Sequence, residues 1–123
     1  MLKKTITYTD FNGNDRTEDF YFNITEAEAA EMQFSTEGGY KERIERIIQM
    51  KDQPSILKAF KEFILLAYGE KSEDGRRFNK SKDISDAFAS TQAYSILFME
   101  LATDADKAAE FVNAVIPQVK AKG

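Results

Sequence analysis

The sequence predicts an α+β fold that is mainly α-helical, with an N-terminal β-hairpin followed by a compact bundle of five to six helices. An Asn-Gly pair lies between two β-prone runs near the N-terminus, and apolar residues in most later segments recur at the helical period. Capping residues or a proline precede these segments. The length of 123 residues indicates one domain, with the hairpin at about 2–24, the helical body at about 25–117 and a short tail at 118–123.

The hairpin is predicted from the runs "KKTITYT" and "RTEDFYFNI" on either side of "DFNGND". With Gly13 at its centre, Ile6 faces Phe20, whereas a shift of one residue would place Ile6 opposite Asp19. This register needs a loop of three or five residues instead of a two-residue turn. The side of the hairpin that carries Phe20 and Phe22 is expected to pack against the helices.

Two helices are expected between the hairpin and Pro54. Thr25 and Glu28 have the spacing of a capping box, which satisfies amide groups at a helix start. The helix that they begin should end near Gly38 and Gly39. The second helix is predicted from "YKERIERIIQMK", in which one face carries Tyr40, Ile44, Ile47 and Ile48.

A third helix is predicted to begin around Pro54, because a proline that closely follows Asp52 suits the first turn of a helix. Gly69 follows the helical pattern at the place where a left-handed C-cap would be needed. The apolar face of this helix carries Ile56, Phe60, Phe63, Ile64 and Ala67.

The segment "YGEKSEDGRRFNKSKD", residues 68–83, combines glycines with many charged residues but matches neither a phosphate loop nor a calcium loop. A phosphate loop follows a strand and leads into a helix, whereas Gly69 is expected to end a helix. A calcium loop needs alternating oxygen ligands and a distal glutamate, which the turn-like residues 72–75 do not provide. We therefore expect a solvated joint between helices, with Phe78 as its apolar anchor.

Three more helices are predicted from "SKDISDAFAS", "TQAYSILFMELA" and "TDADKAAEFVNAVIP", each opened by Ser or Thr. Thr103 and Asp106 form a partial capping box for the last of them, and Pro117 is expected to end it.

Histidine and cysteine are both absent from the sequence. Their absence excludes thiol nucleophiles, Ser-His-Asp relays, redox pairs and zinc sites built from thiolate or imidazole. Acidic residues at helix starts are expected to stabilise the helix dipole. We therefore predict no catalytic residue, no metal site and no cofactor.

The formal net charge is −4, and the lysines and arginines are scattered among acidic residues, which argues against a nucleic-acid partner. The sequence has no apolar run long enough to cross a bilayer and no signal-peptide pattern. We therefore expect an intracellular protein without a membrane partner.

Three apolar residues fall on the polar sides of predicted helices, namely Leu65, Ile96 and Met99. In "TQAYSILFMELA", Ile96 and Met99 lie on the outward side, whereas the inward face carries Tyr94, Leu97, Phe98 and Leu101. A helix that is apolar all round is either enclosed by its neighbours or has a second partner. The sequence leaves both readings open, and under the second the three residues form a surface for a protein partner or for self-association into a homo-oligomer.

The stretches "YTDFNGNDRTEDFYFNIT", "AYGEKSEDGRRFNKS" and "AFASTQAYSILFMELATDADKAAEFVNAVIP" resemble the tail assembly chaperones of long-tailed bacteriophages and prophages, especially those of Gram-positive hosts. The resemblance extends from the hairpin to Pro117. It implies a helper protein of the host cytoplasm, absent from the mature virion, that binds the tape measure protein and keeps it soluble. It brings no catalytic residues and no small-molecule substrate.

Two other functions remain open at this stage. A structural tail or connector subunit would persist in the finished particle and form a closed ring or a stacked interface. An enzyme that uses only carboxylate or tyrosine chemistry would need a concave site with strongly perturbed acids.

Overall fold

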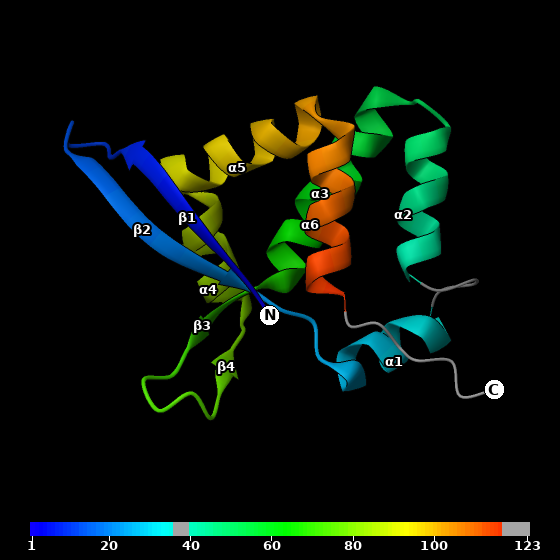
Figure 1. The fold of residues 1–123 in the computed structure, drawn as a ribbon, viewed down its shortest axis with the longest axis horizontal. Coiled ribbons are helices and arrows are strands. Elements are labelled where there is room, and N and C mark those ends of the chain that lie inside the picture. The colour runs from blue at the N-terminus through cyan, green and yellow to red at the C-terminus, as the bar shows by residue number, and fades with distance from the viewer. Residues whose placement is uncertain (36–39, 117–123) are drawn as a thin grey trace.

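The computed structural model describes the backbone of residues 1–35 and 40–116, and it confirms the predicted fold class. Figure 1 shows the long N-terminal hairpin on one side of the molecule and the helices on the other. Within the described residues the elements are β1 (Leu2–Thr9), β2 (Asp15–Phe22), α1 (Glu26–Ser35), α2 (Tyr40–Gln49), α3 (Gln53–Ala67), β3 (Tyr68–Lys71), β4 (Phe78–Asn79), α4 (Lys82–Ala89), α5 (Gln92–Thr103) and α6 (Ala105–Val115).

The hairpin is part of a larger sheet, which the sequence did not predict. Four strands lie in the order β1-β2-β3-β4, and every neighbouring pair is antiparallel. Strand β3 pairs with the end of β2 near the body, where Tyr21 faces Gly69 and Phe22 faces Tyr68. Residues 68–79 thus form a second, short hairpin, which projects away from the helices in Figure 1.

The predicted register of the first hairpin is wrong by two residues. Ile6 faces Glu18, not Phe20, and Phe20 faces Lys4. The reason lies in Gly13, whose φ of 82° places it in the left-handed region. That conformation suits the last residue of a three-residue loop and not its centre.

Asp10 holds this loop in place. Its backbone N–H donates to the carbonyl oxygen of Asn14 at 2.8 Å, which closes the loop. Its carboxylate accepts hydrogen bonds from the backbone N–H groups of Asn12 and Asn14, each at 2.9 Å, and from Nε of Arg16 at 2.6 Å. These bonds lower the pKa of the Asp10 carboxyl, the Arg16 bond most of all.

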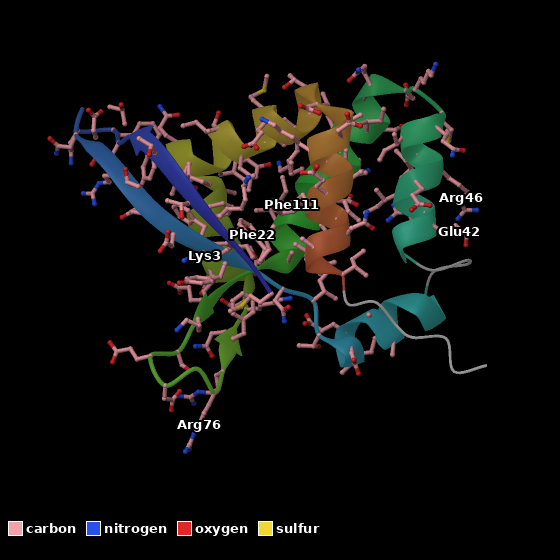
Figure 2. All side chains as sticks on the ribbon, in the orientation of Figure 1. Lys3, Phe22, Glu42, Arg46, Arg76 and Phe111 are labelled. Atoms are coloured by element: carbon pink, nitrogen blue, oxygen red, sulfur yellow. The ribbon has the colours of Figure 1, made fainter. Side chains whose placement is uncertain are left out.

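A register shift of two residues leaves each side chain on its original face. The prediction that Phe20 and Phe22 pack against the helices is therefore confirmed, because both side chains are buried. The ring centroid of Phe22 lies 5.8 Å from that of Phe88 and 5.2 Å from that of Phe111. Figure 2 shows Phe22 and Phe111 together near the centre of the molecule. The frequent use of phenylalanine thus supplies a core that joins the sheet to α4 and α6.

Most of the predicted helix starts are confirmed. The N–H of Thr25 donates to Oε1 of Glu28 at 3.0 Å, and the N–H of Glu28 donates to Oγ1 of Thr25 at 3.2 Å, which is the expected capping box. Burial opposes ionisation of Glu28, but the bonds from Thr25 and from Lys80 outweigh it and lower the pKa of this carboxyl. Ser81 and Thr91 also cap α4 and α5 through their side chains.

Helix α6 begins differently from the prediction. Its N-cap is Asp104, whose Oδ1 accepts from the N–H groups of Asp106 and Lys107 at 3.0 and 3.2 Å. Thr103 is still part of α5, and its hydroxyl donates to the carbonyl oxygen of Met99 at 2.6 Å. The predicted helix ends at 38–39 and at Pro117 lie outside the described residues.

Gly69 is not a left-handed cap. Helix α3 ends at Ala67, its C-cap Tyr68 has an extended conformation, and Gly69 is a buried residue of β3. A Cβ atom at Gly69 would lie 2.6 Å from Cε2 of Phe78 and 2.9 Å from the carbonyl oxygen of Asn79. The joint is therefore a hairpin whose two arms touch. The Phe78 ring is partly buried and lies over Gly69, outside the main hydrophobic core, and its role as an anchor remains a prediction.

Candidate protein-binding site

Helix α5 exposes two of the three residues that the sequence singles out. Ile96 and Met99 are 43% and 53% exposed, one turn apart on the helix. The opposite face is turned into the core, where Leu97 and Leu101 are buried and Phe98 is partly buried. Because α5 contacts β1, α3, α4 and α6 on that side, it is enclosed on one face and open on the other.

Leu65, the third residue, does not have the predicted exposure. It is partly buried and packs against the hydrophobic core, while its neighbour Leu66 is 39% exposed. Helix α4 covers this part of α3, and the Ser85 hydroxyl donates to the Leu65 carbonyl oxygen at 3.0 Å. The structure thus places Ile96 and Met99 on one open face and puts Leu65 elsewhere. A binding role for any of the three remains a prediction.

A groove between the sheet and α4, which we call the β3/α4 groove, was not predicted from the sequence. Its volume is about 310 Å³. The rings of Tyr68 and Phe88 stack in it with their centroids 4.0 Å apart and their planes 9° apart, and the Phe20 ring lies 5.3 Å from that of Phe88. The residues that line the groove are Phe20, Tyr68, Glu70, Asp83, Ile84, Ala87, Phe88 and Thr91.

No local signal marks this groove in the sequence, because its two walls come together only when β3 joins the sheet. The Tyr68 hydroxyl lies in negatively charged surroundings. Burial raises the pKa of its hydroxyl, and the negative charges of Glu70 and Glu18 raise it further. The groove is therefore both aromatic and negatively charged.

A second groove, of about 290 Å³, lies between β1 and helices α5 and α6. Here the charges neutralise one another. Oε1 of Glu100 lies 3.3 Å from Nζ of Lys4 and 3.8 Å from Nζ of Lys107. This arrangement ties the hairpin to two helices, so three of the four charged side chains that line the groove already pair within the chain.

Across residues 1–35 and 40–116, no group of three or more acidic, histidine or cysteine side chains could hold a metal ion. A search of the same residues finds no helix with the length and apolar character needed to cross a membrane.

Comparison with known proteins decides the family. A family model described as phage tail assembly chaperone matches residues 1–122. The chain belongs to the phage tail assembly chaperone family. The resemblance inferred from the sequence is thereby confirmed, and the protein has a role in tail assembly. The description of the family as a chaperone indicates a role that is carried out through protein partners of the tail. Comparisons with curated proteins and with solved structures give no match.

Proposed function

We propose that this chaperone binds the tape measure protein during tail assembly and keeps it soluble until the tail tube polymerises around it. The match to the tail assembly chaperone family over residues 1–122 carries the proposal. The open face of α5 supports it, since Ile96 and Met99 are exposed on a helix whose opposite face packs against the core.

The spacing of these two side chains suits a helical client. Residues three positions apart lie next to each other on a helix surface and form one continuous apolar strip. Such a strip can pack against the apolar stripe of an amphipathic helix. A client helix whose stripe is covered in this way is protected from aggregation until the tail proteins replace the chaperone.

In this proposal the protein acts in the host cytoplasm and leaves before the virion is complete. It needs no cofactor, small-molecule substrate, nucleic acid or membrane. Self-association through the same face of α5 would compete with the client, because both would cover Ile96 and Met99.

Coexpression with the tape measure protein of the same phage tests the proposal. Wild type should keep the client soluble and copurify with it, whereas Ile96→Asp and Met99→Asp should retain about a tenth as much client. Met50→Asp is the matched control, because Met50 is 68% exposed but lies outside α5.

Two results would contradict the proposal. If wild type never retains the tape measure protein, the chaperone does not bind this client. If the protein is found at a fixed copy number in purified virions, it is a structural subunit of the tail. Thermal melting of each variant separates lost binding from lost folding.

A further inference from the structure

The β3/α4 groove has an apolar floor that is open to solvent. Phe20 and Phe88 are buried at its base, and Tyr68 and Ile84 are partly buried along its walls. Ala87 is exposed and small, so it leaves the space above the rings free. Aromatic rings at the base of an open groove are typical anchoring points for a partner side chain.

Two carboxylates border this floor, one from each wall. Glu70 lies on β3 and Asp83 on the first turn of α4, and both are exposed. Neither of them has an ion-pair partner among the described residues. The groove therefore carries negative charge that the chain does not neutralise.

The nearby lysines are engaged elsewhere. Nζ of Lys82 lies 2.6 Å from Oδ2 of Asp86, and Nζ of Lys80 lies 2.9 Å from Oε2 of Glu28. Lys71 lies over the ring of Tyr21 at 5.9 Å. Side chains alternate between the two faces of a strand, so Lys71 and Glu70 point to opposite faces of β3. None of these lysines therefore neutralises Glu70 or Asp83, and both carboxylates remain available to a cation from a partner.

We propose that the β3/α4 groove binds a segment of the tape measure protein in which an apolar side chain lies next to a lysine or arginine. The apolar side chain packs on the rings of Phe20, Tyr68 and Phe88. The cation pairs with Glu70 and Asp83, and an arginine could also lie against an aromatic ring. This inference rests on the proposed function and adds a second, charged contact to the apolar face of α5.

Charge disfavours a second copy of the chain as the occupant of the groove. Each copy carries a formal net charge of −4, so two copies repel each other.

Two pairs of variants test the groove. Ala87→Trp fills it, and Ala30→Trp makes the same change at an exposed position of α1 outside it. Glu70→Lys reverses a charge at its border, and Glu73→Lys makes the same reversal in the turn after β3. Each is coexpressed with the tape measure protein, and binding of purified chaperone to overlapping peptides of that protein is then measured at low and high salt.

Ala87→Trp and Glu70→Lys should each weaken binding of the best peptide about tenfold, whereas the two controls should bind like wild type. That peptide should contain an apolar residue next to Lys or Arg, and high salt should weaken its binding to wild type. Because Glu70 is exposed, Glu70→Lys should fold even if Ala87→Trp does not.

Three outcomes would overturn the inference, and they can be told apart. If wild type retains the client and both groove variants bind as tightly as wild type, the groove is not the site but the proposed function stands. If wild type alone sediments as an oligomer that Ala87→Trp dissociates, the groove holds a second copy. If wild type does not retain the client, the proposed function fails and the inference fails with it.

Discussion

Replacing Gly69 with alanine should destabilise the protein through overpacking of the β3/β4 hairpin. The new Cβ would lie 2.6 Å from Cε2 of Phe78 and 2.9 Å from the carbonyl oxygen of Asn79. The ring can rotate away, but the carbonyl belongs to the paired strand and can move only if the strand moves. Overpacking of this kind costs about 1–3 kcal/mol. For 123 residues this lowers the melting temperature by about 4 °C per kcal/mol.

Gly75→Ala is the matched control. Gly75 has a φ of 75°, and no described atom lies within 4 Å of a Cβ built there. The cost of this substitution should be about 1 kcal/mol and come from backbone conformation alone. Gly75→Asn should cost less than Gly75→Ala, since asparagine tolerates the left-handed region.

Phe78→Ala distinguishes destabilisation by overpacking from destabilisation by backbone conformation. Combined with Gly69→Ala it should recover part of the lost free energy of unfolding, because one of the two contacts disappears, whereas combined with Gly75→Ala it should recover none. Urea unfolding measures all of these differences. The reasoning would be refuted if Gly69→Ala melted at the wild-type temperature, or if Phe78→Ala gave no recovery in the Gly69→Ala protein.

Three further predictions concern the helices. Asp104→Ala should lower the free energy of unfolding by about 1 kcal/mol, because α6 loses its N-cap, and Thr103→Ala should lower it less. A larger loss for Thr103→Ala than for Asp104→Ala in urea unfolding would contradict this. Leu97→Ala should lower the free energy of unfolding by about 2–5 kcal/mol because it leaves a cavity, whereas Ile96→Asp should fold normally. If both variants lowered the melting temperature equally, α5 would have no open face. The pKa of the Glu28 carboxyl is lower in the folded protein, so the unfolded chain binds more protons, and the stability that Glu28 contributes should be lost as the pH falls below the ordinary pKa of a glutamate, about 4.3. Glu28→Gln should make the free energy of unfolding depend less steeply on pH in this range. An unchanged pH dependence would show that the Glu28 carboxyl does not cause the loss of stability.

The sequence alone predicted several features whose hydrogen bonds join residues close together in the chain. The capping box of Thr25 and Glu28 spans three residues, and the caps of α4 and α5 are equally local. The burial of Phe20 and Phe22 was also predictable, because side chains alternate along a strand and a register error of two residues leaves the faces unchanged.

Features that depend on distant parts of the chain were decided only by the tertiary structure. Strand β3 exists because β2 offers it an edge, and the N–H of Asn23 donates to the carbonyl oxygen of Ala67 at 2.9 Å beside it. As a residue of β3, Gly69 is not a helix cap, and its close contacts come from Phe78 and Asn79 of β4. Leu65 is covered because α4, twenty residues further along, packs over it through Ser85.

Of the two candidate binding surfaces, one could be predicted from the sequence and the other could not. The exposure of Ile96 and Met99 follows from the helical period of one continuous segment, so the sequence could indicate it. The β3/α4 groove needs Phe20, Tyr68 and Phe88, which come from three elements far apart in the sequence. Periodicity describes the faces of one element, whereas a groove depends on how several elements pack, and that packing is set by the free energy of the whole fold.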